Sequence, residues 1–166
     1  MAEEAKSSKW EGKTKAEIKG LKVEQVWPLL EDFCSFNKLV PQIEICDQIE
    51  GVYGQPGLIR HCGLRDPSRS TGADDSQMMW ANEKLLVMDP IQRCFSYAVV
   101  DGNTGLKSYV ATIKVFEMNG DDGKGCVIEW SFVCEPADGW TFDGLLSLID
   151  SLLKTTAKNI EELCSA

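Results

Sequence analysis

The sequence predicts an α+β fold in which a seven-stranded antiparallel sheet curls around one long C-terminal helix and leaves an internal cavity. Seven segments alternate apolar and polar residues with the period of two expected of a half-buried strand. Six of them follow one another, mostly through short turns, which favours antiparallel pairing. The chain then closes on one long segment with apolar residues at helical spacing. A twisted sheet covered by a single helix leaves space between the two layers.

The chain begins with a charged tail, residues 1–8, followed by a single domain over residues 9–166. The tail is expected to be flexible because it has no apolar cluster to anchor it, and it lacks the apolar core of a secretory signal. Residues 10–19, WEGKTKAEIK, alternate cleanly and predict the first strand.

Two short helical segments follow the first strand. Residues 23–33 carry apolar side chains at helical spacing, and Pro28 within them is expected in a first turn or at a kink. Residues 34–39 predict one further helical turn that ends before Pro41.

Six more strands are predicted after these helices. Their expected ranges are residues 43–52, 57–64, 77–88, 93–101, 106–118 and 126–136. Turn sequences such as YGQPG and DGNTG separate most of them. The connection over residues 65–76 is long and polar, so we expect it to be mobile and to flank the entrance of the cavity.

The last segment, residues 139–164, is the strongest helix prediction in the chain, with Thr141 as its N-cap. Its apolar stripe consists of Phe142, Leu145, Leu146, Ile149, Leu152, Leu153, Ile160 and Leu163. A helix with one such stripe is expected to lie on one face of the sheet.

The composition excludes several classes of partner. Acidic residues outnumber basic ones by 26 to 17, and the net charge of −9 repels nucleic acid and anionic lipid. No apolar run is long enough to span a bilayer, so no integral membrane association is expected. The single histidine, His61, excludes a two-histidine metal site, and we expect neither a metal nor an organic cofactor. The sequence does not indicate an oligomeric state.

The cysteines indicate a compartment. The seven cysteines form an odd set without a Cys-x-x-Cys pair, and their neighbours are apolar. They are expected to be reduced and mostly buried, which is typical of a cytoplasmic protein.

Three polar side chains fall on the apolar faces of predicted strands. In QMMWANEKLL, residues 77–86, alternation places Glu83 on the same face as Ala81 and Val87. Arg60 and Tyr109 fall on the apolar faces of two other strands. Because burying such groups without partners costs several kcal/mol, they either satisfy one another or line a cavity.

Two interpretations of this trio are open. A buried Arg60–Glu83 pair with a nearby hydroxyl is a common structural network, and Glu83→Gln would then cost on the order of 3 kcal/mol. If Glu83 instead serves a ligand, the same change should leave stability equal or slightly higher. Trp27 and Trp130 are assigned to core packing alone.

The stretches EQVWPLLEDF, GQPGLIR, WANEKLL, GLKSYVATIKV and CVIEWSF, with the closing helix, resemble plant proteins of the lachrymatory factor synthase type over residues 10–164. That family has the Bet v 1-like, START-related helix-grip fold of the polyketide cyclase/dehydrase and lipid transport group. The resemblance implies catalytic roles for Arg60 in the G-x-x-R strand, Glu83 in W-A-x-E-K-L and Tyr109 in the G-x-x-x-Y strand.

Two functions follow from the resemblance and the trio. In a cofactor-free isomerase or cyclase, Glu83 moves a proton while Arg60 and Tyr109 hold the oxygen on which negative charge develops. In a non-catalytic carrier or receptor, the trio anchors the polar end of a small apolar ligand. Abscisic acid receptors share the architecture, but CGLRDPS and TGLKS stand here where that group has its gate and latch motifs, which makes that hormone an unlikely ligand.

Overall fold

A computed structural model of the chain describes residues 9–64, 78–118 and 125–165. The elements are, in order, β1 (Trp10–Lys19), α2 (Val23–Glu31), the 3-10 helix η1 (Phe33–Lys38), β2 (Ile43–Glu50), β3 (Ile59–Leu64), β4 (Met79–Asp89), β5 (Cys94–Gly102), β6 (Lys107–Glu117), β7 (Gly125–Glu135) and α3 (Phe142–Ser165). Every strand and helix predicted from the sequence is present in that order. The predicted tail and the predicted mobile connection, residues 65–76, lie outside the described residues.

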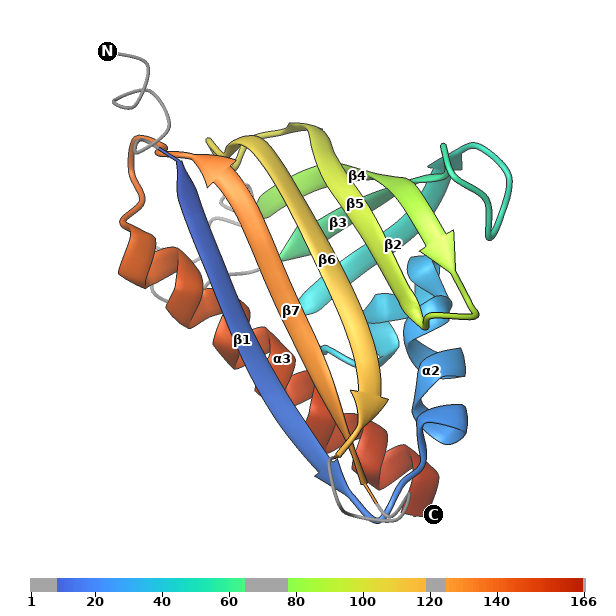
Figure 1. The fold of residues 1–166 in the computed structure, drawn as a ribbon. Helices are drawn as coiled ribbons and strands as arrows, with labels where there is room; N and C mark the ends of the chain where they lie inside the picture. The colour runs from blue at the N-terminus through green and yellow to red at the C-terminus, as the bar shows by residue number, and fades with distance from the viewer. Residues whose placement is uncertain (1–8, 65–77, 119–124, 166) are drawn as a thin grey trace.

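The seven strands form one antiparallel sheet in the order β1-β7-β6-β5-β4-β3-β2. Strands β2 to β7 each pair with their neighbour in the chain, and β1 joins the sheet beside β7. Figure 1 shows the sheet curled over α3, which packs against β1 and β7. The α+β helix-grip architecture predicted from the sequence is therefore confirmed.

The long helix is anchored at its start by its predicted cap. The hydroxyl oxygen of Thr141 accepts a hydrogen bond of 2.9 Å from the backbone N–H of Gly144, which satisfies one of the free donors of the first turn. The predicted stripe is buried over most of its length, but Leu163 is 53% exposed. The last turn presents Cys164 to the core instead. No described helix has the length and apolar content to cross a membrane.

One local prediction, the inward face for Val87, was wrong, and the prediction for Pro28 is narrowed. Pro28 lies inside α2 rather than in its first turn, so the kink stays the prediction for this residue. Its ring is exposed and the helix ends three residues later, so only the Glu24 carbonyl loses a helical donor. Val87 is 48% exposed, because a register shift between Leu85 and Val87 interrupts the alternation of β4.

Candidate functional site

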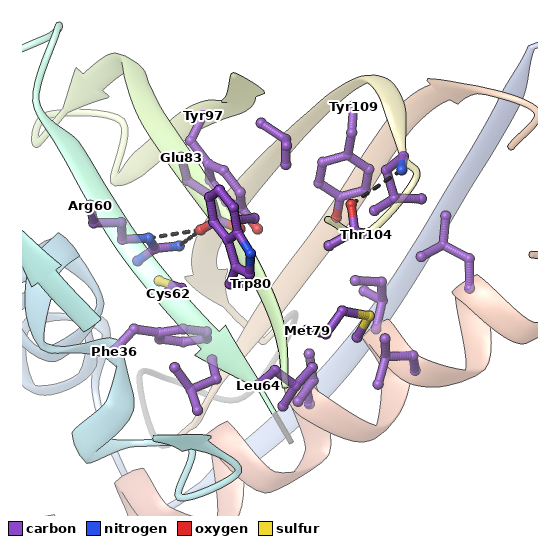
Figure 2. Close-up of a pocket in the computed structure, with 18 of the residues that line it drawn as sticks. Phe36, Arg60, Cys62, Leu64, Met79, Trp80, Glu83, Tyr97, Thr104 and Tyr109 are labelled. Carbon is purple, nitrogen blue, oxygen red and sulfur yellow. Dashed lines mark hydrogen bonds and ion pairs between the residues drawn. The ribbon is translucent and has the colours of Figure 1, made fainter. Parts of the chain in front are cut away.

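A cavity of about 100 Å³ lies between the sheet and α3. Dry cavities of roughly 150 Å³ lined by apolar side chains bind molecules the size of benzene, so this volume suits a small organic molecule. Helix α3 contributes the apolar wall of Leu145, Leu148, Ile149 and Leu152. Arg60, Glu83 and Tyr109 all line the same cavity, from three different strands (Figure 2).

The first polar feature of the cavity is an ion pair between β3 and β4. Arg60 and Glu83 are direct partners in the strand register, so their side chains leave the sheet side by side. Arg60 Nε and Nη2 each donate to Glu83 Oε1 at 2.8 Å. Among the described residues these are the only hydrogen bonds of the Glu83 carboxylate, and both use the same oxygen. Oxygen Oε2 therefore keeps its capacity to accept a hydrogen bond.

The guanidinium of Arg60 is held from every side. Its Nη1 donates to the backbone carbonyl of Phe33 at 2.6 Å. Its central carbon lies 3.8 Å from the centre of the Phe33 ring, 5.0 Å from that of Tyr97 and 5.3 Å from that of Phe36. Such positions give favourable cation–π contacts. The side chain is 2% exposed, so its charge is balanced by Glu83 rather than by water.

The second polar feature is the Tyr109 hydroxyl. The β5–β6 connection and the start of β6 are irregular: Ser108 has a φ of 54° and the register with β7 shifts between Lys107 and Val110. Bulges of this kind often re-aim side chains beside functional sites. The Tyr109 ring stacks on Phe132, with centres 5.6 Å apart and planes 20° apart. Gly12 on β1 makes room for Phe132, because a Cβ there would lie 2.6 Å from its ring.

Two buried donors at this part of the cavity have no partner. The hydroxyl of Tyr109 and the indole Nε1 of Trp130 are both buried, and neither is hydrogen-bonded within the part of the chain that the structure describes. Burial raises the pKa of Tyr109 above its usual range, and the nearby side chains of Trp130 and Tyr97 oppose that shift only in part, although neither makes a hydrogen bond of good geometry with the hydroxyl. An unpaired buried donor costs about 1–3 kcal/mol. Both residues line the cavity, where a bound molecule can supply an acceptor.

Tyr97 connects the two polar features. Its ring lies against the Arg60 guanidinium and is 6.3 Å from the ring of Tyr109. Thr104 lies near Tyr109 in the lining (Figure 2). Its backbone carbonyl accepts a hydrogen bond of 2.8 Å from the indole Nε1 of Trp140, another lining residue. Arg60, Tyr97 and Tyr109 thus form a continuous polar wall opposite the apolar side chains of α3.

Sequence reasoning missed part of this wall. It assigned Trp130 to core packing alone, whereas the indole also lines the cavity with an unpaired N–H. The sequence carried part of this information. Trp130 shares the inward face of β7 with Ile128 and Phe132, and a buried indole N–H needs a hydrogen-bond partner. Trp80 also contributes to the lining, although alternation places it on the other face of β4.

A curled antiparallel sheet gripping one long helix over a mostly apolar cavity defines a protein of the helix-grip class, whose cavity binds small ligands. The chain belongs to the polyketide cyclase/dehydrase and lipid transport family, the profile of which matches residues 9–164. That match supports ligand binding in general.

Solved bacterial structures share the fold. The protein XoxI from Bacillus cereus is 23% identical, with a TM-score of 0.71 over 93% of this chain and 94% of its own. An uncharacterized protein from Bacillus thuringiensis is 21% identical, with a TM-score of 0.69 over 94% of this chain and 99% of its own. At this level of identity, the likeness concerns the fold alone.

Proposed function

We propose that the cavity binds a small, uncharged and largely apolar molecule that carries one hydrogen-bond-accepting oxygen. The single observation that carries this proposal is the pair of unpartnered donors, Tyr109 Oη and Trp130 Nε1, beside an otherwise apolar lining. One acceptor oxygen placed between them would remove the penalty of two buried, unpaired donors.

The electrostatics of the wall favour an uncharged ligand over a carboxylate. Arg60 is the one cation among the described lining residues, and Glu83 already neutralises it at 2.8 Å. A ligand carboxylate would have to displace Glu83 or be buried beside it as a second negative charge, and burying an unpaired charge is expensive. A neutral oxygen needs only the free N–H and O–H groups.

The same arrangement supports a cofactor-free isomerisation or cyclisation of the lachrymatory factor synthase-like kind. In this proposal Glu83 accepts a proton through Oε2 from a carbon next to the polarised oxygen and returns it at a second position. Arg60 and Tyr109 stabilise the negative charge that develops on the oxygen between the two transfers. Likeness to the plant lachrymatory factor synthase group and a cytoplasmic location for this chain are part of the proposal, but the substrate of the plant enzyme is not.

A non-catalytic carrier is the second candidate, and one observation favours it. The Arg60–Glu83 pair needs no ligand to satisfy the guanidinium. Nε and Nη2 of Arg60 already donate to Glu83, and Nη1 donates to the Phe33 carbonyl. Such a pair can serve the fold while Tyr109 and Trp130 hold the ligand.

Filling the cavity tests the binding proposal. Ala81 lines the cavity, and Ala81→Leu places three additional carbon atoms in a space of about 100 Å³. Ala98→Leu is the matched control, because Ala98 lies on a neighbouring strand beside Tyr97 and alternates to the other face. We expect Ala81→Leu to lose at least tenfold in affinity for a benzene-sized, uncharged probe that carries one acceptor oxygen, such as anisole, measured by ligand-observed NMR. Ala98→Leu should bind this probe like wild type.

Mass spectrometry of an organic extract of the purified protein identifies what the cavity retains. An uncharged oxygenated molecule present in wild type and absent from Ala81→Leu supports the proposal. Equal probe binding by both variants, or a carboxylate as the retained molecule, contradicts it. Turnover of the identified molecule by wild type but not by Glu83→Gln separates the enzyme from the carrier.

A further inference from the structure

Two cysteines face each other across the strands β2 and β3. Cys46 and Cys62 are direct partners in the antiparallel register. Their sulfur atoms are 3.6 Å apart, and the Cys62 thiol donates to the sulfur of Cys46. Both side chains are buried, and all seven cysteines of the chain are free thiols. Among these seven, this is the one pair with a thiol–thiol contact in the described structure.

The backbone geometry at this pair suits a disulfide. Residues directly opposite in an antiparallel sheet have Cα atoms roughly 4.5 or 5.5 Å apart, and disulfides span Cα separations of roughly 4.4–6.8 Å. A bond length of about 2.05 Å requires the two sulfur atoms to approach by roughly 1.5 Å, which side-chain rotation can supply. The bond would fasten β2, the edge strand of the sheet, to the strand that carries Arg60.

The surroundings make the two thiols unequal. The hydrogen bond from Cys62, assisted by the nearby Arg60 cation, lowers the pKa of Cys46, while the same hydrogen bond and burial raise the pKa of Cys62. The thiolate is the reactive form of cysteine. Cys46 is therefore the nucleophile of the pair, and the Cys62 sulfur is close enough to attack an oxidised Cys46 sulfur.

We propose that Cys46 and Cys62 form a reversible redox site that a small hydroperoxide oxidises to a disulfide. The Cys46 thiolate attacks the outer oxygen of the hydroperoxide, the O–O bond breaks, and an alcohol or water leaves with a proton. Cys46 becomes a sulfenic acid, and the Cys62 sulfur then attacks it to form the S–S bond and release water. Two thiols lose two electrons and two protons, and the hydroperoxide takes both.

Cys62 is part of the cavity lining, and its sulfur lies 3.6 Å from that of Cys46, so a small hydroperoxide would approach Cys46 from the cavity, past Cys62. Cys126 and Cys134 serve as internal references. Both are buried on β7, and burial raises the pKa of each, so they lack the conditions that activate Cys46. The redox site needs no bound ligand, and its test does not depend on whether the cavity binds the molecule proposed above.

Tryptic mapping tests this site directly. Cleavage after Lys38, Arg60 and Arg65 gives the peptides 39–60 and 61–65, each with one cysteine. After treatment of the whole protein with a few equivalents of hydrogen peroxide and blocking of free thiols, we expect these peptides joined and two hydrogens lighter than the separate thiols. Dithiothreitol should release them, and Cys126 and Cys134 should remain alkylated thiols. The oxidised protein should melt roughly 5 °C higher.

Single variants test the assigned roles. Cys62→Ser should leave a sulfenic acid on Cys46 that dimedone traps, whereas Cys46→Ser should leave Cys62 unmodified, and Cys134→Ser should oxidise like wild type. The proposal is overturned if Cys46 and Cys62 of peroxide-treated wild type are both recovered as alkylated thiols, or if they are oxidised to sulfinic or sulfonic acid without a joined peptide. Because the peptide mapping uses wild-type protein, it tests the proposal even if a variant folds poorly.

Discussion

The two polar features of the cavity differ in how far the protein alone satisfies them. At one, Arg60 and Glu83 meet through two contacts of 2.8 Å, and the remaining donor finds the Phe33 carbonyl. At the other, Tyr109 Oη and Trp130 Nε1 are buried without partners in the described structure. Both features belong to one lining and lie on one sheet, with Tyr97 between them.

This difference separates stability from binding. A satisfied pair resists removal of either member, because the survivor is left as an uncompensated buried charge. A buried donor without a partner lowers the stability of the fold, and an acceptor on a bound ligand can remove that cost. We therefore expect substitutions at the Arg60–Glu83 pair to act on stability first, and substitutions at the Tyr109–Trp130 pair to act on binding.

The largest expected effect is that of Arg60→Met. This change removes the buried guanidinium and leaves Glu83 and the Phe33 carbonyl without their donors, which should cost about 3 kcal/mol or roughly 10 °C in Tm. Arg93→Met is the control, because Arg93 pairs with Glu24 at 3.3 Å on the surface and should cost less than about 1 kcal/mol. Equal losses in urea unfolding would remove the stabilising role given to Arg60.

Glu83→Gln should come next, at about 2 kcal/mol. The amide can still accept from Arg60, but the buried guanidinium loses its counter-charge. Of the two outcomes that the sequence left open, the contacts at Oε1 thus favour the structural one. Glu129→Gln is matched in side-chain exposure, 20% against 15%, and its lysine contacts are 3.8 and 3.9 Å long. We expect that control within about 1 kcal/mol of wild type by thermal melting.

The ionisation of Tyr109 should affect how the free energy of unfolding falls at alkaline pH. The pKa of Tyr109 is raised in the folded state by burial, above the ordinary value of 10.0 that holds on unfolding. Stability from this group is therefore complete below about pH 10 and is lost as pH rises beyond it, by up to about 1.4 kcal/mol per pH unit. Tyr97 and several thiols add to the same trend.

Comparing Tyr109→Phe with wild type isolates the contribution of this one hydroxyl. Urea unfolding between pH 9.5 and 11 should show a shallower decline for the variant. Parallel curves would mean that Tyr109 ionises as readily in the folded protein as in the unfolded chain.

The smallest expected effect is that of Tyr109→Phe at pH 7. Removing a buried, unpaired hydroxyl should leave stability unchanged or raise it by up to about 1 kcal/mol, because the cost of burying that group disappears, while the affinity for an oxygenated ligand falls about tenfold. Thr156→Val removes a buried hydroxyl that donates to the Leu152 carbonyl at 2.7 Å, and it should cost about 1 kcal/mol. A larger loss for Tyr109→Phe than for Thr156→Val would show that the Tyr109 hydroxyl has a structural partner.

Much of the fold could be predicted from local pattern. Alternation identified the strands, helical spacing and Thr141 identified α3, and the short turns implied antiparallel pairing. These signals depend on residues close together in the chain, so a sequence carries them without knowledge of the fold. Alternation failed where β4 bulges, because an extra residue shifts every later side chain to the opposite face.

For the site, the sequence by itself determined that Arg60, Glu83 and Tyr109 point inward from separate strands. Only the tertiary structure decided which of them are satisfied. Arg60 is held by Glu83 and by the Phe33 carbonyl, whereas the Tyr109 hydroxyl lies near the indole of Trp130 and has no hydrogen-bond partner among the residues that the structure describes. Periodicity reports the face of a strand, but hydrogen bonding depends on distances of a few tenths of an ångström between residues far apart in the chain, and those are set only when the sheet closes over α3.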